Sequence, residues 1–460
     1  MSAELWTAQE IAAATSGTVH GDFAATGVTF DSREVGPGDL FIALKGETTD
    51  GHCFLDRAYA AGAAGAIVSE EIAQPHVQVA DTTDALNDLG RASRARSAAR
   101  ICGVTGSVGK TGTKEALWAA LDRSARGRAH RSVKSYNNHT GVPLSLARMP
   151  RHARYGVFEM GMNHAGELAA LTRLVRPHVA IVTAIASAHR EFFDSEEAIA
   201  DAKGEIFQGL EPGGVAIVPF DSPHRDRLLA AARPYAATIR TFGLSDGADI
   251  RARDVVAAPK GGSLVTASLP DANLTYTISQ PGEHWVSNSL AVLAAVQALG
   301  GDLAQAGLAL ADMAGLKGRG ERHRVLLDGG EALLIDESYN ANPSSMRATL
   351  QTLGAEKKVA RRLAVLGAMR ELGEGSDEFH AGLAEPIAAA CVEHAILVGP
   401  EMSPLHKALG GKVNAVHVPD AAAALDALRE VIRPGDAILV KGSNSVGLSA
   451  VVESLAGGKS

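Results

Sequence analysis

The stretch ICGVTGSVGKTGTKEAL, residues 101–117, decides the fold of this chain. It begins with an apolar strand predicted over residues 101–105, passes through a glycine-rich turn and enters a helix predicted over residues 110–121. This order directs backbone N–H groups and the positive end of a helix at a phosphate group. The stretch therefore predicts a nucleotide-binding sheet.

The turn supplies the residues expected to contact the nucleotide. Lys110 would meet the β and γ phosphates, and Thr111 would hold Mg²⁺. The turn departs from the plain P-loop pattern, because Val104 stands where the first glycine should be. A glycine-rich turn with an incidental Lys-Thr pair is the alternative, but the strand context and the Gly-Lys-Thr sequence favour phosphate binding. The expected contacts are Gly106, Ser107, Val108, Gly109, Lys110, Thr111 and Gly112.

Strands and helices alternate on both sides of this turn, which is typical of a mainly parallel sheet. We predict strands over Tyr155–Glu159 and residues 178–183, 214–218, 332–336, 363–366, His394–Val398 and 437–440. A charged, glycine-rich stretch at residues 315–324 separates two such series. Shorter strands at residues 28–30 and 39–44, followed by a helix at residues 54–61, precede both. The sequence therefore predicts an α/β fold of three domains, over residues 1–84, 85–315 and 316–460.

The composition argues against several classes of protein. The 460 residues are 46% hydrophobic and 21% charged, which is a globular balance. A net charge of -8 opposes nucleic-acid binding. Cys53, Cys102 and Cys391 form no CxxC pair, so a reducing cytoplasm is expected, without disulfides or a thiolate metal centre. The first residues do not read as a signal peptide, and no apolar run reaches the roughly 20 residues of a membrane-spanning helix.

Three more side chains are candidates for metal binding or charge. Glu159 ends a strand beside the phosphate turn, where a carboxylate suits Mg²⁺, although a solvated or paired glutamate would look the same. His189 follows the strand at residues 178–183 and could offer an imidazole to a second cation. Lys203 lies in a helical stretch, where an exposed lysine is the ordinary expectation. The residue types alone do not single out Lys203.

Several strings resemble those of the Mur ligases, which join an amino acid or peptide to a UDP-muramoyl acceptor. They most resemble the member that adds D-alanyl-D-alanine to a UDP-N-acetylmuramoyl-tripeptide, and the similarity covers nearly the whole chain. The strings are SYNNHTGVPLSL (135–146), FEMGMNHAGE (158–167), AHREFF (188–193), AKGEIF (202–207), DESYNANPSSM (336–346), VLGAMRELG (365–373) and DSREVGPGDLFIALKGETTDGHCF (31–54).

The resemblance implies an ATP-dependent, peptide-bond-forming ligase with an acyl-phosphate intermediate, and it assigns roles to the three domains. The first would bind the UDP substrate, the central one ATP, and the dinucleotide-fold-like last one D-alanyl-D-alanine. Thr111 and Glu159 would hold one Mg²⁺, His189 would touch a second, and Lys203 would carry a carbamate. Lys110, His189 and Lys203 would be the catalytic residues. The further contacts implied are Asn288 with adenine, Arg319 with phosphate, Asp336 with ribose, Ser32, Arg33 and Asn138 with the UDP substrate, and Asn340 and Asn342 with substrate.

Two positions depart from the family pattern, and other readings stay open. Ala368 stands where Asp is common, and Asn444 stands where Arg is common, so the 444 segment lacks a guanidinium fork.

A sister ligase that adds the third residue of the peptide, or a folate polyglutamate ligase, would share the ATP chemistry. A nucleotide-dependent switch that ligates nothing would share only the ATP site. We expect a cytoplasmic monomer without membrane insertion.

Overall fold

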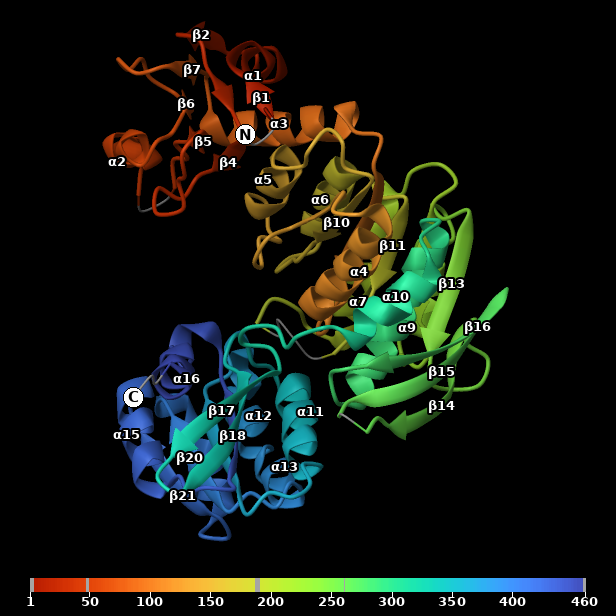
Figure 1. Cartoon of the computed structure of the whole chain (residues 1–460), viewed down its shortest axis with the longest axis vertical. Coiled ribbons are helices and arrows are strands. Elements are labelled where there is room, and N and C mark those ends of the chain that lie inside the picture. The colour runs from red at the N-terminus through yellow and green to blue at the C-terminus, as the bar shows by residue number, and fades with distance from the viewer. Residues whose placement is uncertain (1–3, 47–48, 187–190, 260, 458–460) are drawn as a thin grey trace.

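The computed structural model describes residues 4–46, 49–186, 191–259 and 261–457 (Figure 1). Within these residues the chain forms, in order, a five-stranded, a nine-stranded and a six-stranded sheet, together with a small two-stranded sheet at the start. The three larger sheets follow one another along the molecule, from the N-terminal end at the top of Figure 1 to the C-terminal end at the bottom. The α/β architecture of three domains is confirmed. No helix in the described part of the chain is both long and apolar enough to cross a bilayer.

The N-terminal sheet has the order β2-β7-β6-β5-β4, with β2 antiparallel and the other neighbours parallel. The strand runs DLFI and GAIV are almost wholly buried, which is why they lie at its centre. Helix α3 runs through residue 84, the predicted domain boundary, so it joins the first two units as one element. The bounds are β1 (Trp6–Thr7), α1 (Ala8–Thr15), β2 (Thr18–His20), β3 (Ala24–Ala25), β4 (Gly27–Thr29), β5 (Asp39–Ile42), α2 (Leu55–Ala60), β6 (Gly65–Val68), β7 (His76–Gln78) and α3 (Thr82–Arg96).

The central sheet has the order β16-β15-β14-β13-β12-β11-β8-β10-β9. It is parallel from β9 to β14 and ends in an antiparallel extension, β14 to β16. Its strands are β8 (Arg100–Thr105), β9 (Ala129–Arg131), β10 (Tyr155–Glu159), β11 (Val179–Val182), β12 (Val215–Pro219), β13 (Thr238–Gly243), β14 (Ile250–Ala257), β15 (Ser263–Leu269) and β16 (Ala272–Ile278). Its helices are α4 (Lys110–Ala125), α5 (Gly141–Ala147), α6 (Glu167–Val175), α7 (Glu196–Gly204), α8 (Arg225–Ala232), α9 (Glu283–Ala298) and α10 (Leu303–Ala311).

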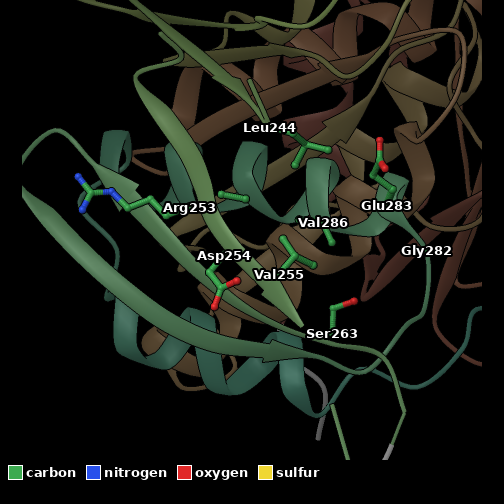
Figure 2. Close-up of a pocket in the computed structure, with 9 residues that line it drawn as sticks. Leu244, Arg253, Asp254, Val255, Ser263, Gly282, Glu283 and Val286 are labelled. Atoms are coloured by element: carbon green, nitrogen blue, oxygen red, sulfur yellow. The ribbon is translucent and has the colours of Figure 1, made fainter. Parts of the chain in front are cut away.

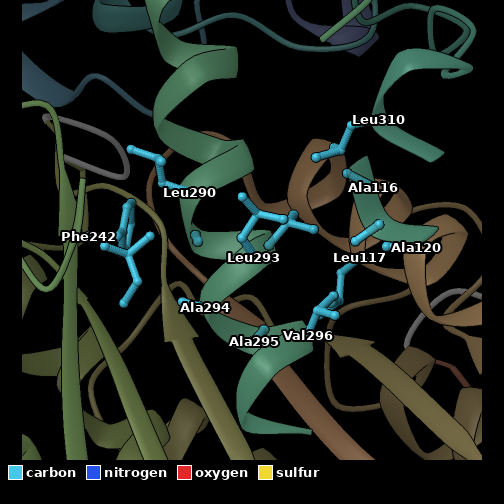
Figure 3. Packing of buried hydrophobic residues seen from close by; sticks show 14 of the residues in the cluster. Ala116, Leu117, Ala120, Phe242, Leu290, Leu293, Ala294, Ala295, Val296 and Leu310 are labelled. Carbon is cyan, nitrogen blue, oxygen red and sulfur yellow. The ribbon is translucent and has the colours of Figure 1, made fainter. Parts of the chain in front are cut away.

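Helices α4, α9 and α10 pack together on one face of the central sheet (Figure 3). Leu117 and Leu121 of α4 and Leu293 of α9 are fully buried there. Such side chains contribute about 1.5–3 kcal/mol each when they are removed from water. This packing fixes the start of α4, and with it the glycine-rich turn, at the carboxyl end of β8.

The C-terminal sheet has the order β17-β18-β22-β19-β20-β21 and is parallel except for the β17–β18 pair. Its central strands are buried apolar runs, typical of a parallel sheet covered on both faces. The bounds are β17 (Glu321–Leu327), β18 (Gly330–Glu337), α11 (Pro343–Gly354), β19 (Arg362–Gly367), α12 (Ser376–Ala381), α13 (Ala384–Ala389), β20 (His394–Val398), α14 (Ser403–Leu409), β21 (Asn414–Val418), α15 (Ala421–Val431), β22 (Ala437–Lys441) and α16 (Ser449–Ala456).

Candidate active site

The glycine-rich turn between β8 and α4 has, at two points, a backbone conformation that residues other than glycine rarely adopt. Gly106 has φ +150° and Gly109 has φ +85°. A Cβ on Gly106 would lie 2.0 Å from Oγ1 of Thr183, whose hydroxyl is within hydrogen-bond distance of the Val108 carbonyl at 2.5 Å. The ammonium of Lys110 donates to the Gly106 carbonyl at 2.6 Å, which closes the turn on itself. The turn is therefore a rigid cradle rather than a loose loop.

This cradle forms one wall of a cavity of about 800 Å³, which the central and C-terminal units line together. That volume is within the range of small-molecule sites. Most of the predicted site residues lie on its wall. Those lining it are Ser107, Val108, Gly109, Lys110, Thr111, Gly112, Glu159, Asn288, Arg319, Asn340 and Asn342.

A cluster of oxygen atoms lies where the cradle meets the end of β10. The Thr111 hydroxyl donates to Oε2 of Glu159 at 2.9 Å, and the Asn137 amide donates to Oε1 of the same carboxylate at 2.8 Å. Glu159 is 1% exposed, so its carboxylate is held by these bonds rather than by water. A hydroxyl and a carboxylate are hard oxygen donors of the kind that Mg²⁺ prefers.

Lys203, which the residue types alone place on an exposed helix face, is fully buried on α7. Its Nζ has no hydrogen-bond partner among the described residues. Burial first, and then the like charge of Lys110, hold the pKa of Lys203 well below its usual value. Burial also lowers the pKa of Lys110, while Glu159 acts in the opposite direction. Within the described part of the chain, Lys203 is therefore a buried amine without a compensating partner, close enough to Lys110 for the two charges to interact.

The C-terminal unit contributes the opposite wall of the cavity. The guanidinium carbon of Arg319 lies 4.3 Å from the centre of the Tyr339 ring. The carboxylate of Asp336 accepts backbone hydrogen bonds from Gly318 at 2.8 Å and Ser338 at 3.0 Å, so it fixes the turn that carries Arg319. Asp336 does not itself line the cavity as described, and its contact with ribose stays a prediction.

Three residues that are predicted to contact the UDP substrate lie apart from this wall. Ser32 is buried in the N-terminal unit, and the exposed Arg33 is paired with Asp31 at 2.7 Å. The side chain of Asn138 accepts the backbone N–H of Gly141 at 2.9 Å and so caps the turn before α5. His189 lies outside the described residues. The roles predicted for these four side chains stay predictions.

Sequence reasoning missed several residues of the cavity. Asn137, the bonding partner of Glu159, is adjacent in sequence to Asn138, which was selected instead. Lys441, at the end of β22, donates to the Asn340 carbonyl at 2.9 Å and is 2% exposed. Arg370 lies beside the segment of Asn444, because its Nε donates to the hydroxyl of Ser445 at 3.3 Å. It thus places a guanidinium next to the position where the family commonly has one.

A second, smaller hollow of about 360 Å³ lies between β14 and the start of α9 (Figure 2). Val255 and Val286 face it, while the side chain of Arg253 extends away from them. None of the predicted site residues lines it. The geometry therefore favours the larger cavity as the candidate active site.

Three family models match successive parts of the chain. The model described as Mur ligase family, catalytic domain, matches residues 24–95. The Mur ligase middle domain matches residues 104–296, and the Mur ligase, glutamate ligase domain, matches residues 318–444. The matches follow the order of the three large sheets.

Similar proteins align with the chain over nearly its whole length. UDP-N-acetylmuramoyl-tripeptide--D-alanyl-D-alanine ligase of Escherichia coli (strain K12) is 34% identical over 440 residues, with 94% of each chain covered. A crystal structure of MurF from Acinetobacter baumannii is 32% identical, with a TM-score of 0.84 and 98% of this chain and 99% of that chain covered. The crystal structure of MurF ligase from Thermotoga maritima in complex with ADP is 27% identical, with a TM-score of 0.77 and coverages of 94% and 97%.

Proposed function

Because this chain belongs to the Mur ligase family, we propose that it joins D-alanyl-D-alanine to the terminal carboxylate of a UDP-N-acetylmuramoyl-tripeptide, with cleavage of ATP to ADP and phosphate. This is a step in the synthesis of peptidoglycan precursors. The use of a UDP-linked acceptor and of ATP supports a cytoplasmic location for the proposed reaction. Action as a monomer stays a prediction.

The observation that carries the proposal is the composition of the cavity wall. Lys110 and the Thr111–Glu159 pair come from the central unit, while Arg319 and Asn340 come from the C-terminal unit. A phosphate cradle, a pair of hard oxygen donors and a second domain face one space. Such a space suits a triphosphate on one side and an incoming amine on the other.

The first chemical step activates an unreactive acid. A carboxylate oxygen of the tripeptide attacks the γ-phosphorus of ATP, the bond to the β-phosphate oxygen breaks, and ADP leaves an acyl phosphate behind. Two anions must approach each other for this step. The ammonium of Lys110, held on the Gly106 carbonyl at the floor of the cradle, lowers that repulsion.

The residues on the wall fit Mg²⁺. Thr111 and Glu159 would hold one ion, since their oxygen atoms are 2.9 Å apart and face the cavity beside the cradle. When bound, Mg²⁺ neutralises charge on the phosphate oxygens. A second ion would be shared by His189 and Lys203.

Lys203 fits this role only after chemical change, because an ammonium would repel a cation. Its lowered pKa favours the neutral amine, whose lone pair attacks CO₂. A C–N bond forms, one proton is released, and the side chain becomes a carbamate anion with two oxygen atoms. This conversion would also give a role in the site to the Nζ group, which has no hydrogen-bond partner in the segments that the structure describes.

In the second step the amine of D-alanyl-D-alanine attacks the acyl carbonyl. The tetrahedral intermediate loses a proton and expels phosphate, which leaves the new amide bond. Water must be kept from the acyl phosphate during this step. We propose that the turn at residues 315–320 is the hinge about which the C-terminal unit closes over the cavity. The proposed contacts in the closed state are Asn288 with adenine, Arg319 with phosphate, Asp336 with ribose, Asn340 and Asn342 with the amine substrate, and Ser32, Arg33 and Asn138 with the UDP acceptor.

Substrate dependence tests the proposal directly. ADP release by the purified chain should require both the UDP-tripeptide and D-alanyl-D-alanine, and either substrate alone should give only background hydrolysis. ADP release that ignores both would identify a nucleotide-dependent switch and overturn the proposal. Release with a UDP-dipeptide and a single amino acid would identify the sister ligase, and release with a folate substrate the folate ligase. Running the assay with diaminopimelate and with lysine in the tripeptide resolves the third residue.

A further inference from the structure

Lys114 lies one helical turn beyond Lys110 on α4, and its side chain is fully buried. Its Nζ donates to the backbone carbonyls of Ser132 at 3.0 Å and Lys134 at 2.8 Å. The same atom lies 3.0 Å from the carboxylate of Glu115 and 3.9 Å from Oε2 of Glu159. A buried ammonium is costly unless its donors are satisfied and its charge is balanced. Here both conditions are met.

The two carbonyls belong to the segment that leads from β9 toward Asn137. The start of that segment is also bound to the end of β10, because the backbone N–H of Glu159 donates to the Ser132 hydroxyl at 3.2 Å. The far end is bound through Asn137, whose amide donates to Glu159 Oε1 at 2.8 Å. One ammonium thus ties the segment and the carboxylate to the helix that carries Thr111.

The placement of the charges distinguishes Lys114 from the residues of the cavity wall. Thr111, Asn137 and Glu159 line the cavity, whereas Lys114 does not. Its charge therefore acts on Glu159 through the protein interior, from the side away from the cavity, and it does not contact a ligand in the cavity. Attraction between opposite charges at about 4 Å is stronger inside a protein than in water. It holds the Oε2 atom toward Thr111, the partner with which it would bind a cation.

We propose that Lys114 is a positioning residue that orients the Glu159 carboxylate for the divalent cation bound beside the nucleotide. The proposal rests on the proposed function only in taking the cavity as the nucleotide site. It predicts that loss of the Lys114 charge weakens the coupling between Mg²⁺ and nucleotide, while nucleotide binding without Mg²⁺ is kept.

The test measures ADP affinity of the full chain by isothermal titration calorimetry, with Mg²⁺ and with EDTA, in the absence of both ligase substrates. For Lys114→Gln, the Mg²⁺-dependent gain in ADP affinity should fall by about tenfold, which is roughly 1.4 kcal/mol of coupling. Affinity in EDTA should stay within about threefold of the parent. Lys114→Arg, which keeps the charge, should recover most of the gain.

Glu115→Gln is the matched control, because it removes the other carboxylate at Lys114 and leaves Glu159 untouched. Its Mg²⁺ gain should match that of the parent within about twofold. If Lys114→Gln does not fold, the double variant Lys114→Met with Glu115→Gln removes both charges, so that the Glu115 carboxylate is not left beside a neutral side chain. An unchanged Mg²⁺ gain in the neutral variant would overturn the proposal. Equal loss of ADP affinity with and without Mg²⁺ would also overturn it, because it would reveal a purely structural role.

A failed ligase assay leaves this test intact, since no ligase substrate enters it. Conversely, an unchanged Mg²⁺ gain in the Lys114 variants would leave the dependence of ADP release on both substrates unaffected. The two results are therefore separable.

Discussion

The hydroxyl of Thr111 donates a hydrogen bond of 2.9 Å to Oε2 of Glu159, across 48 residues of sequence. Thr111 lies in the first turn of α4 and Glu159 ends β10, and the two elements meet because β10 lies beside β8, the strand that leads into the cradle. Parallel strands bring their carboxyl ends to one edge of a sheet, where ligands bind in open α/β folds. This bond therefore links the phosphate cradle to a carboxylate that lines the cavity.

Removal of the Lys110 ammonium should abolish ligation. In Lys110→Ala we expect the rate of ADP formation to fall by at least roughly 10²–10³-fold, the cost of losing one preorganised charge at a reacting centre. A steady-state assay coupled to ADP measures it. Lys357→Ala, at an exposed position, is the control and should keep parental turnover. Normal turnover in Lys110→Ala would remove the assignment of the phosphate cradle.

Lys203→Ala should be nearly inactive and partly restored by short carboxylates. The variant removes the amine that would become a carbamate, and added formate or acetate can place an oxygen pair in the space that is left. We expect a loss of at least about 10²-fold and recovery of a measurable fraction with additive. Turnover is measured with increasing carboxylate concentration. Full activity without additive would refute the carbamate role.

Gly106→Ala and Gly127→Ala separate crowding from backbone strain. Both glycines have positive φ, +150° and +79°, but a Cβ on Gly106 would lie 2.0 Å from Thr183 Oγ1, whereas nothing lies within 4 Å at Gly127. Both variants should lower the melting temperature, because non-glycine residues pay roughly 1–2 kcal/mol at positive φ. Only Gly106→Ala should weaken ADP binding, by about tenfold or more in calorimetry. Equal ADP affinity in the two variants would show that the cradle tolerates the displacement.

The sequence predicted best those strands that are short, apolar and fully buried. Tyr155–Glu159 and His394–Val398 have in the structure the bounds that were predicted. The antiparallel extension β14 to β16 was missed, because its strands bury only one face and mix Thr, Ser and Asp with apolar residues. Strand β17, with the sequence ERHRVLL, was assigned in part to a charged linker for the same reason. Burial on one side leaves a weaker signal than burial on both.

The spacing of residues in the sequence located the cradle, but it did not identify the buried lysines and the asparagine that lie near it. Lys114 and Lys203 both look like exposed helical lysines in the sequence, yet each is fully buried. Whether a lysine is buried depends on which distant segments pack over it, as Ser132 and Lys134 do over Lys114. Asn137 and Lys441 were missed for the same reason, since their partners come from other elements. The resemblance to a family selected Lys203, and the residue types alone did not.

Acid should destabilise the central unit through His130 on β9. Burial lowers the pKa of His130 to about 4, and its Nε2 lies 2.8 Å from the Ser145 carbonyl. The unfolded chain takes up this proton near pH 6.5, before the folded chain does, so stability is lost as pH falls from about 6.5 to about 4. The loss is of the order of a few kcal/mol at most, since each pKa unit is worth about 1.4 kcal/mol. His130→Gln should reduce the fall in melting temperature over this range, to which His284, with its pKa also lowered to about 4 by burial, contributes as well. His152→Gln, at an exposed position, should follow the parent. Parallel curves for the parent and His130→Gln would exclude His130 as the group responsible.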